Sequence, residues 1–221
     1  MIITIDGPAG SGKSTVAEVL AKKLGFYHFN SGSLYRAISA YLIDNGVFSI
    51  SNENFSEKIE KCDIKVEFIN SFQHVYVNNI DYSKKLRDIK VSELTPQFSV
   101  HPTLRNIVDK CQKEFTMNHN IVIDGRDIGS FVLPNAEIKF YLDCDVNERA
   151  RRRYKELKNR GESVSLEEIK RKIEVRDEFD RNKTIAPLKI PKGAVIIDSS
   201  RLSIDEVVDK MLKTINSFSK F

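Results

Sequence analysis

The chain has 221 residues, of which 41% are hydrophobic and 30% are charged, and its formal net charge is +4. This length allows one compact domain with a sizeable core, and this composition argues against a disordered segment and against a membrane protein. The mild positive charge fits an acidic small molecule at least as well as a nucleic acid.

The cellular compartment is inferred from the cysteines and from the first residues. Three cysteines, Cys62, Cys111 and Cys144, lie far apart, which fits neither a disulfide framework nor a zinc site. No apolar stretch approaches the roughly 20 residues that span a bilayer, and the apolar run 2–5 leads into a glycine loop without a signal peptide. We therefore expect a cytoplasmic protein with reduced thiols.

Strands and helices alternate along most of the chain. The β-branched run 2–5 predicts a first strand. Four segments have apolar residues at helical spacing and are predicted as helices: 16–24, 34–42, 104–115 and 207–215. Three short β-branched runs are predicted as strands buried on both faces: 120–123, 138–142 and 194–197. This order predicts an α/β fold in which a central parallel sheet is flanked by helices, with ligands at the carboxyl ends of the strands.

Residues 62–82 interrupt this order. Apolar and charged side chains alternate over residues 64–68, as expected for a half-buried strand. The Asn-Ser pair at 70–71 and the Asn-Asn pair at 78–79 are typical of tight turns. We therefore predict a small antiparallel insertion here.

A glycine-rich loop follows the first predicted strand and opens the first predicted helix. Its sequence, Gly7-x-x-x-x-Gly12-Lys13-Ser14, is the Walker A pattern of phosphate-binding loops. Such loops wrap backbone N–H groups around phosphate oxygens, so we expect Lys13 to reach the β- and γ-phosphates of ATP and Ser14 to ligate Mg²⁺. A plain glycine turn with an exposed lysine would not need this strand–loop–helix context. The predicted ATP-binding residues are Gly7, Pro8, Ala9, Gly10, Ser11, Gly12, Lys13, Ser14 and Thr15.

A phosphate acceptor has to be found elsewhere, and two further segments offer polar side chains. The segment NSGSLYR at 30–36 has a small N-cap residue and an arginine soon after the helix begins. After the strand that ends at Ile123, Asp124 fits a Walker-B-type carboxylate for the metal ion, and Arg126 and Asp127 are expected in the same crevice. An arginine beside a carboxylate suits a ligand that has both a phosphate and a base with hydrogen-bond donors.

Four sequence blocks together resemble the bacterial-type cytidylate kinases: GPAGSGKS, NSGSLYR, IDGRDIG and RDEFDRNKTIAPL. The resemblance extends over nearly the whole chain. It implies a P-loop nucleoside monophosphate (NMP) kinase with a three-layer fold, a CMP-binding insertion and a short helical lid. It also implies a monomer that uses ATP and Mg²⁺ and acts on CMP or dCMP. The regions implied are a core of 1–30, 89–148 and 184–221, an NMP-binding region of 31–88 and a lid region of 149–183, all within a single domain of 1–221.

The resemblance also assigns site residues. The CMP-binding positions it implies are Ser31, Arg36, Arg105, Arg126, Asp127, Asp180 and Lys183. Asp127 and Arg105 would read the cytosine edge, because a carboxylate accepts from the N4 amino group and an arginine donates to O2. Asp180 would bind the ribose. The catalytic positions expected are Lys13, Arg36, Arg126, Arg176 and Arg181, the last two in the lid.

Three positions depart from the family pattern. Asn30 stands where an aspartate is usual, Pro96 lies near a position that commonly supplies a base-contacting serine, and Lys183 stands where an arginine is frequent. These departures bear on fine cytosine selectivity and not on the reaction.

Other interpretations stay open at this point. The chain could be a different P-loop kinase that acts on UMP, AMP, dTMP or a non-nucleotide alcohol, or a noncatalytic nucleotide- or RNA-binding module that uses the basic region 149–183. We expect the arginines at 149 and 151–153 to form mainly a solvated helix face, with one or two directed at phosphates. Arg176 and Asp180 could be a plain i,i+4 helix pair. Histidines such as His28 follow no metal spacing and are assigned to surface or core packing.

Overall fold

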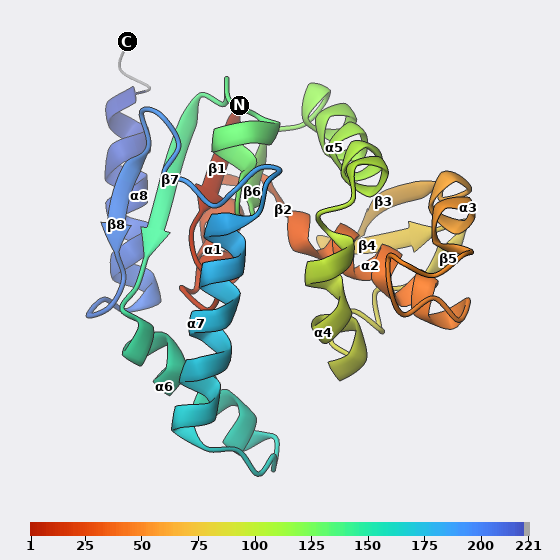
Figure 1. The fold of residues 1–221 in the computed structure, drawn as a ribbon. Coiled ribbons are helices and arrows are strands. Elements are labelled where there is room, and N and C mark those ends of the chain that lie inside the picture. Colours follow the sequence, from red (N-terminus) through yellow and green to blue (C-terminus); the bar gives the residue numbers. More distant parts are fainter. Residues whose placement is uncertain (219–221) are drawn as a thin grey trace. The chain divides into compact units, whose positions relative to one another are not determined.

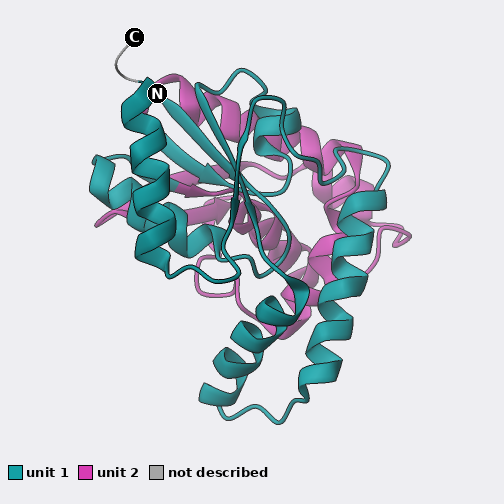
Figure 2. Ribbon diagram, turned by 90° about the vertical axis from the view of Figure 1, so that its left-hand side faces the viewer, with its two compact units in different colours: residues 1–28, 121–221 teal, residues 29–120 magenta. Residues whose placement is uncertain are grey.

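The structure is a computed structural model that describes residues 1–218. The chain divides into two compact units (Figure 2). The first unit consists of residues 1–28 together with the chain from 121 onward, and the second consists of residues 29–120. The predicted division into core, NMP-binding and lid regions stays a prediction.

The first unit is built on a sheet with the strand order β2-β6-β1-β7-β8 (Figure 1). The strands of this sheet are β1 (Ile2–Asp6), β2 (Tyr27–Asn30), β6 (Ile121–Asp124), β7 (Ile138–Asp143) and β8 (Val195–Asp198), and the division between the two units falls within β2, after His28. The helices of the first unit are α1 (Lys13–Leu24), the π-helical turn η1 (Ile128–Val132), α6 (Val146–Asn159), α7 (Leu166–Asn182) and α8 (Ile204–Phe218). β1 pairs in parallel with both β6 and β7, and β7 pairs in parallel with β8. The predicted parallel sheet flanked by helices is confirmed.

One face of this sheet packs against α1 and α8, which also contact each other (Figure 1). Ile5 of β1 and Phe140 of β7 are fully buried there, together with Leu20 of α1 and Met211 of α8. The β-branched residues of the strands and the apolar residues at helical spacing therefore pack into one shared core. The core fixes β1 and α1, and with them the glycine loop that joins the two elements.

β8 is less buried than the sequence predicts. The apolar run 194–197 was predicted to be covered on both faces, but β8 is the last strand of the sheet and Ile196 is 56% exposed, whereas Ile197 is 5% exposed. All four residues of β6 are buried. Burial on both faces is thus confirmed for β6 and wrong for β8, because only one face of β8 packs against the core.

The second unit contains the predicted antiparallel insertion. Its helices are α2 (Ser31–Asp44), α3 (Phe55–Glu60), α4 (Ile89–Phe98) and α5 (Pro102–Met117), and its sheet order is β3 (Ile64–Ile69), β4 (Phe72–Val77) and β5 (Ile80–Asp81). Both predicted turns have left-handed backbone, with φ of 52° and 67° at residues 70–71 and 52° and 64° at 78–79. Two-residue hairpins favour this conformation. α2 packs against β4 and α4.

The cysteines agree with the sequence interpretation. All three are free thiols. Burial raises the pKa of Cys62 and of Cys111 to about 12, so both thiols stay protonated near neutral pH. Among residues 1–218 there is no helix with the length and apolar character that a membrane crossing needs.

Candidate functional site

The glycine-rich loop joins β1 to α1 at the carboxyl edge of the parallel sheet (Figure 1). Gly7 has a φ of 151°, and a Cβ atom there would lie 2.2 Å from the backbone oxygen of Leu142, so only glycine fits. Gly12, with a φ of 92°, precedes α1 and has no side chain to cap the helix. The first N–H groups of α1 therefore suit an anion, as a phosphate-binding loop requires.

Lys13 lies inside this loop and is 4% exposed. Its Nζ donates to the backbone oxygen of Pro8 at 2.6 Å and to Ser11 Oγ at 3.3 Å. Burial lowers the pKa of Lys13 well below its usual value, and the positive charge of Arg126 adds to this shift, whereas the negative charge of Asp124 opposes it. A bound phosphate would add the negative charge that favours the protonated lysine.

Asp124 ends β6 and lies between two hydrogen-bond donors. Ser14 Oγ donates to Asp124 Oδ2 at 2.7 Å, and His28 Nε2 donates to Oδ1 at 2.8 Å, because an ionised carboxylate only accepts. Burial alone would raise the pKa of Asp124, but these hydrogen bonds and the charges of His28 and Lys13 hold it below its usual value. The structure thus brings together the two predicted metal ligands, Ser14 and Asp124. The contact made by His28 is one that sequence reasoning missed.

Asp6, the last residue of β1, is a second buried carboxylate at this edge. It is 0% exposed, and its Oδ1 and Oδ2 accept from the backbone N–H of Ile128 at 2.8 Å and of Gly129 at 2.7 Å. Burial raises the pKa of Asp6 to about 7, although these two hydrogen bonds and the charge of Lys13 oppose the shift. The sequence analysis gave Asp6 no role.

Three predicted residues meet at the end of α7. Asp180 is 2% exposed and accepts from Arg126 Nε at 3.0 Å and from Arg176 Nε at 3.3 Å. The contact with Arg176 has the i,i+4 spacing of an ordinary helix pair, but Arg126 comes from the loop after β6, so the cluster is more than a helix pair. Burial would raise the pKa of Asp180, and the two arginines keep it below its usual value.

The other predicted residues of the first unit lie near these elements. Asp127 directly precedes η1 and is 5% exposed. Lys183 directly follows α7, and its charge helps to keep the pKa of Asp180 low. Arg181 lies in the last turn of α7 and is exposed.

Arg149 of α6 does not lie on the solvated face that the sequence predicts for most of the arginines at 149 and 151–153. It is 4% exposed and donates to the backbone oxygens of Cys144 at 2.9 Å and of Ala9 at 3.0 Å. Its Nη1 also lies 2.7 Å from Asp177 Oδ2, and the Asp177 side chain is equally buried. Arg149 therefore links the glycine loop to α7 and is not part of the solvated face that the sequence predicts for most of this cluster.

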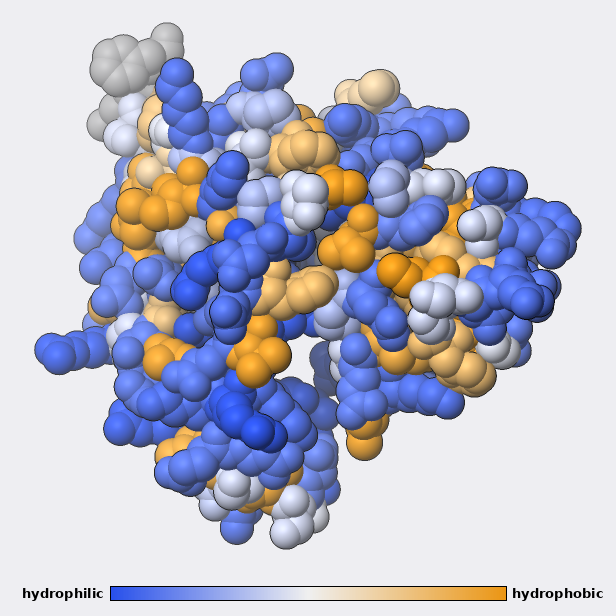
Figure 3. Space-filling view, in the orientation of Figure 1, coloured by the Kyte–Doolittle hydropathy of each residue, from blue (hydrophilic) through white to orange (hydrophobic). Residues whose placement is uncertain are grey.

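Its neighbours Arg151 and Arg153 do lie on a solvated face. Their side chains are 69% and 46% exposed and pair with Glu148 and Glu156 on the same helix. The visible surface of α6 and α7 is largely hydrophilic in the space-filling view (Figure 3). This part of the prediction is confirmed.

In the second unit, Asn30 organises the start of α2. Its side chain accepts from the backbone N–H of Ser33 at 2.9 Å and from Arg36 Nη2 at 3.0 Å. Gln73 of the insertion accepts from the backbone N–H of Asn30 at 2.6 Å and donates to Ser33 Oγ at 2.8 Å. Ser31, the first residue of α2, is 3% exposed. The predicted N-cap is confirmed, and it also orients Arg36.

Arg105 of α5 also contacts α2. Its guanidinium lies 5.9 Å from the ring centre of Tyr35, within cation–π range, and its Nη2 lies 4.0 Å from Asp109 Oδ1. Tyr35 and the predicted residues Ser31 and Arg36 all lie on α2. The contact of Arg105 with Tyr35 therefore places the predicted residues of the second unit on two adjoining helices. Pro96, a departure from the family pattern, lies inside α4.

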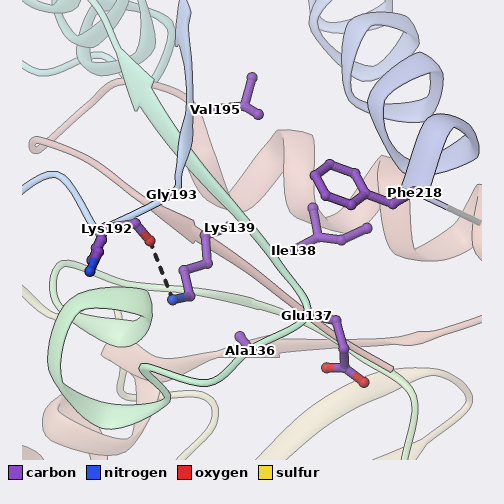
Figure 4. Close-up of a pocket in the computed structure, with 8 residues that line it drawn as sticks. All are labelled: Ala136, Glu137, Ile138, Lys139, Lys192, Gly193, Val195 and Phe218. Atoms are coloured by element: carbon purple, nitrogen blue, oxygen red, sulfur yellow. Dashed lines mark hydrogen bonds between the residues drawn. The ribbon is translucent and has the colours of Figure 1, made fainter. Parts of the chain in front are cut away.

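A hollow of about 210 Å³ lies at the amino ends of the strands of the parallel sheet, opposite the glycine loop (Figure 4). It is lined by residues at the beginnings of β7 and β8, including Ile138 and Val195, and by Phe218 of α8. Ligands of open parallel sheets bind at the carboxyl ends of the strands, so this hollow is not the candidate site. Within residues 1–218, no three or more His, Cys, Asp or Glu side chains are grouped so that they could hold a metal ion.

Known proteins show similarity over nearly the whole chain. A family model described as cytidylate kinase matches residues 3–217. A cytidylate kinase of Thermotoga maritima is 42% identical over 96% of this chain and 96% of its own length, and one of Carboxydothermus hydrogenoformans is 42% identical over 97% of each. Among solved structures, a shikimate kinase of Acinetobacter baumannii in complex with shikimate covers 98% of this chain and 93% of that chain, at 18% identity and a TM-score of 0.47. This structural likeness is too weak to bear on the substrate.

The buried pair of Arg149 and Asp177 yields a first prediction. We expect Arg149→Met to lower the free energy of unfolding by about 3–5 kcal/mol, because Asp177 is left buried without its partner. The exposed Arg153 is the matched control, and Arg153→Met should change the free energy by less than about 1 kcal/mol. Urea denaturation measures both values. Equal effects of the two substitutions would contradict the buried link between the glycine loop and α7.

Proposed function

This chain belongs to the cytidylate kinase family, and we propose that it transfers the γ-phosphate of ATP to CMP or dCMP, giving CDP or dCDP and ADP. Membership of this family indicates an ATP-dependent nucleoside monophosphate kinase. The use of dCMP as an acceptor is part of the proposal. The observation that supports the proposal best is the buried Lys13 in the glycine loop beside the hydrogen-bonded Ser14 and Asp124. Phosphoryl transfer from a nucleoside triphosphate depends on such a group.

The donor ATP is assigned to the glycine loop. Backbone N–H groups of residues 7–15 wrap its phosphates, and Lys13 reaches the β- and γ-phosphates. The low exposure of Lys13 strengthens its attraction to phosphate, because fewer water molecules screen the charge. Arg149 steadies the loop through its hydrogen bond to Ala9.

Mg²⁺ is the expected cofactor, and the residues present fit it. Ser14 Oγ and Asp124 Oδ2 are hard oxygen donors only 2.7 Å apart, and Mg²⁺ in kinases is held by few protein ligands together with waters and substrate phosphates. We propose Ser14 as a direct ligand and Asp124 as a residue that holds a Mg²⁺-bound water. When bound with ATP, the ion neutralises part of the phosphate charge.

The acceptor is assigned to the residues that the sequence predicts: Ser31, Arg36, Arg105, Arg126, Asp127, Asp180 and Lys183. Arg36 and Arg126 bind the acceptor phosphate, because an arginine fork matches phosphate oxygens. Asp127 and Arg105 read cytosine through its N4 amino group and its O2 oxygen. Uracil carries O4 in place of the amino group, so the Asp127 carboxylate repels it.

Catalysis rests on alignment and charge neutralisation, because phosphoryl transfer needs little covalent chemistry from the protein. We assign Lys13, Arg36, Arg126, Arg176 and Arg181 to this task. Arg176 and Arg181 lie on α7 in the proposed lid region 149–183, where closure would exclude water from the reacting phosphate. ATP and CMP or dCMP are the proposed partners. A monomeric state, a cytoplasmic location and the absence of nucleic-acid partners stay predictions.

An acceptor panel tests the proposed function. With ATP and Mg²⁺, we expect ADP release with CMP and dCMP and much slower release with UMP, AMP, GMP and dTMP. Lys13→Ala should lower kcat by about 100- to 1,000-fold, because a positive charge at the transferred phosphate is lost. Lys192→Ala is the matched control, since this exposed lysine lines the hollow at the amino ends of the strands and should keep full activity. Fast turnover of a different monophosphate would overturn the assignment of CMP and dCMP as acceptors. No turnover with any monophosphate would contradict the proposed kinase activity.

Base recognition by Asp127 is tested separately. Asp127→Asn should lower the ratio of kcat/KM for CMP to that for UMP by about tenfold or more, because an amide can donate to the uracil O4 that the carboxylate repels. The two kcat/KM values are measured with the same preparation, so a general loss of folded protein cancels from the ratio. An unchanged ratio would contradict the role of Asp127.

A further inference from the structure

Asp6 is a fully buried carboxylate to which the proposed reaction gives no role. It ends β1 and directly precedes Gly7 of the phosphate-binding loop. Its two oxygens accept from the first two N–H groups of η1, at Ile128 and Gly129. Asp6 thus supplies the cap that these N–H groups need at the start of a helical turn.

The buried position of the Asp6 carboxylate lowers the stability of the folded state. Burial raises the pKa of Asp6 to about 7, and the charge of Asp127 adds to the shift, while Lys13 opposes it. A group whose ionised form is disfavoured by its surroundings weakens the folded state near neutral pH. Groups kept at such a cost are often tied to function, which directs attention to what Asp6 holds in place.

The turn held by Asp6 packs closely against β1. A Cβ atom at Gly129 would lie 2.6 Å from Thr4 Oγ1 and 3.3 Å from Asp6 Oδ2, so η1 sits directly on β1. A π-helical turn of this kind is rare and is frequently found at functional sites. Here it follows the loop that carries Arg126 and Asp127.

These two residues lie between two attachments to β1. Before them, the backbone N–H of Gly125 donates to the backbone oxygen of Ile5 at 3.1 Å. After them, the Asp6 side chain holds Ile128 and Gly129. The first attachment is made by backbone alone, whereas the second depends on the side chain of Asp6. Removal of that side chain frees one end of the segment and leaves the other attached.

We propose that Asp6 is a positioning residue for the acceptor: through Ile128 and Gly129 it fixes the loop that presents Arg126 and Asp127 to the nucleoside monophosphate. The inference rests on the proposed function. It differs from a direct role in ATP binding, because both Asp6 oxygens accept from η1, and its charge affects the pKa of Lys13 less than that of Asp124 does. Loss of Asp6 should therefore affect the acceptor more than the donor.

The test compares Asp6→Asn with the wild-type protein and with Ile3→Val. The asparagine keeps the shape of the side chain, but its NH₂ group cannot accept a backbone hydrogen bond, so one of the two contacts is lost. We expect the KM for CMP to rise about 10- to 100-fold while the KM for ATP stays within about twofold. Ile3→Val changes a buried residue of the same strand that packs in the core with α1 and α8, away from the Asp6 contacts, and should leave both constants unchanged.

Amide hydrogen exchange gives an independent readout. Exchange at Ile128 and Gly129 should speed up in Asp6→Asn, and exchange in α1 should not. Unchanged constants and exchange in the folded variant, or an equal rise of both KM values, would overturn the inference. If wild-type protein itself does not bind or phosphorylate CMP, the proposed function fails, whereas the exchange result at η1 is still obtained.

A second variant covers the case in which Asp6→Asn does not fold. Gly129→Ala leaves Asp6 in place and displaces η1 from its position on β1, because the added Cβ would lie 2.6 Å from Thr4 Oγ1, 3.2 Å from Pro191 Cγ and 3.3 Å from Asp6 Oδ2. The same selective rise in the KM for CMP is expected. Adding Thr4→Ala removes the closest of these three contacts and should restore part of the acceptor affinity, whereas a purely global destabilisation would raise both KM values together.

Discussion

The ammonium group of Lys13 is buried, and only 4% of the residue is exposed. A buried positive charge is stable only beside opposite charge and hydrogen-bond acceptors. Pro8 and Ser11 supply acceptors from the loop itself, and the carboxylates of Asp6 and Asp124 at the ends of β1 and β6 supply negative charge. The parallel pairing of these two strands brings both carboxylates to the lysine, so the sheet and the charge of the site depend on each other.

Each of these carboxylates is in turn held by donors from distant parts of the first unit. Asp124 accepts from Ser14 and His28, and Asp6 accepts from the backbone at the start of η1. The arrangement costs stability, as the raised pKa of Asp6 indicates. What it provides is a fixed set of charged groups in an environment of low polarity, where their attraction to a phosphate is strongest.

The sequence predicted those parts whose signal is local. Gly7, Lys13 and Ser14 stand at fixed spacing in one loop, and the turn pairs of the insertion are adjacent residues, so the loop between β1 and α1 and both turns were predicted correctly. Asp6, His28 and Arg149 were not predicted because their partners Ile128, Asp124 and Ala9 lie 122, 96 and 140 residues away in sequence. Only the folded chain shows these pairs. Ile196 was misjudged for a similar reason, since a short apolar run looks alike in central and edge strands.

In the proposed reaction the site aligns two nucleotides so that a phosphate passes directly from one to the other. The most direct measurement follows the label from ATP that carries ³²P at its γ-phosphate, in the presence of unlabelled CMP and Mg²⁺, with separation of the products by chromatography. We expect the label in the β-phosphate of CDP, with an equal amount of ADP formed. Label found only in inorganic phosphate, or retained in ATP while CMP is present in excess, would contradict it.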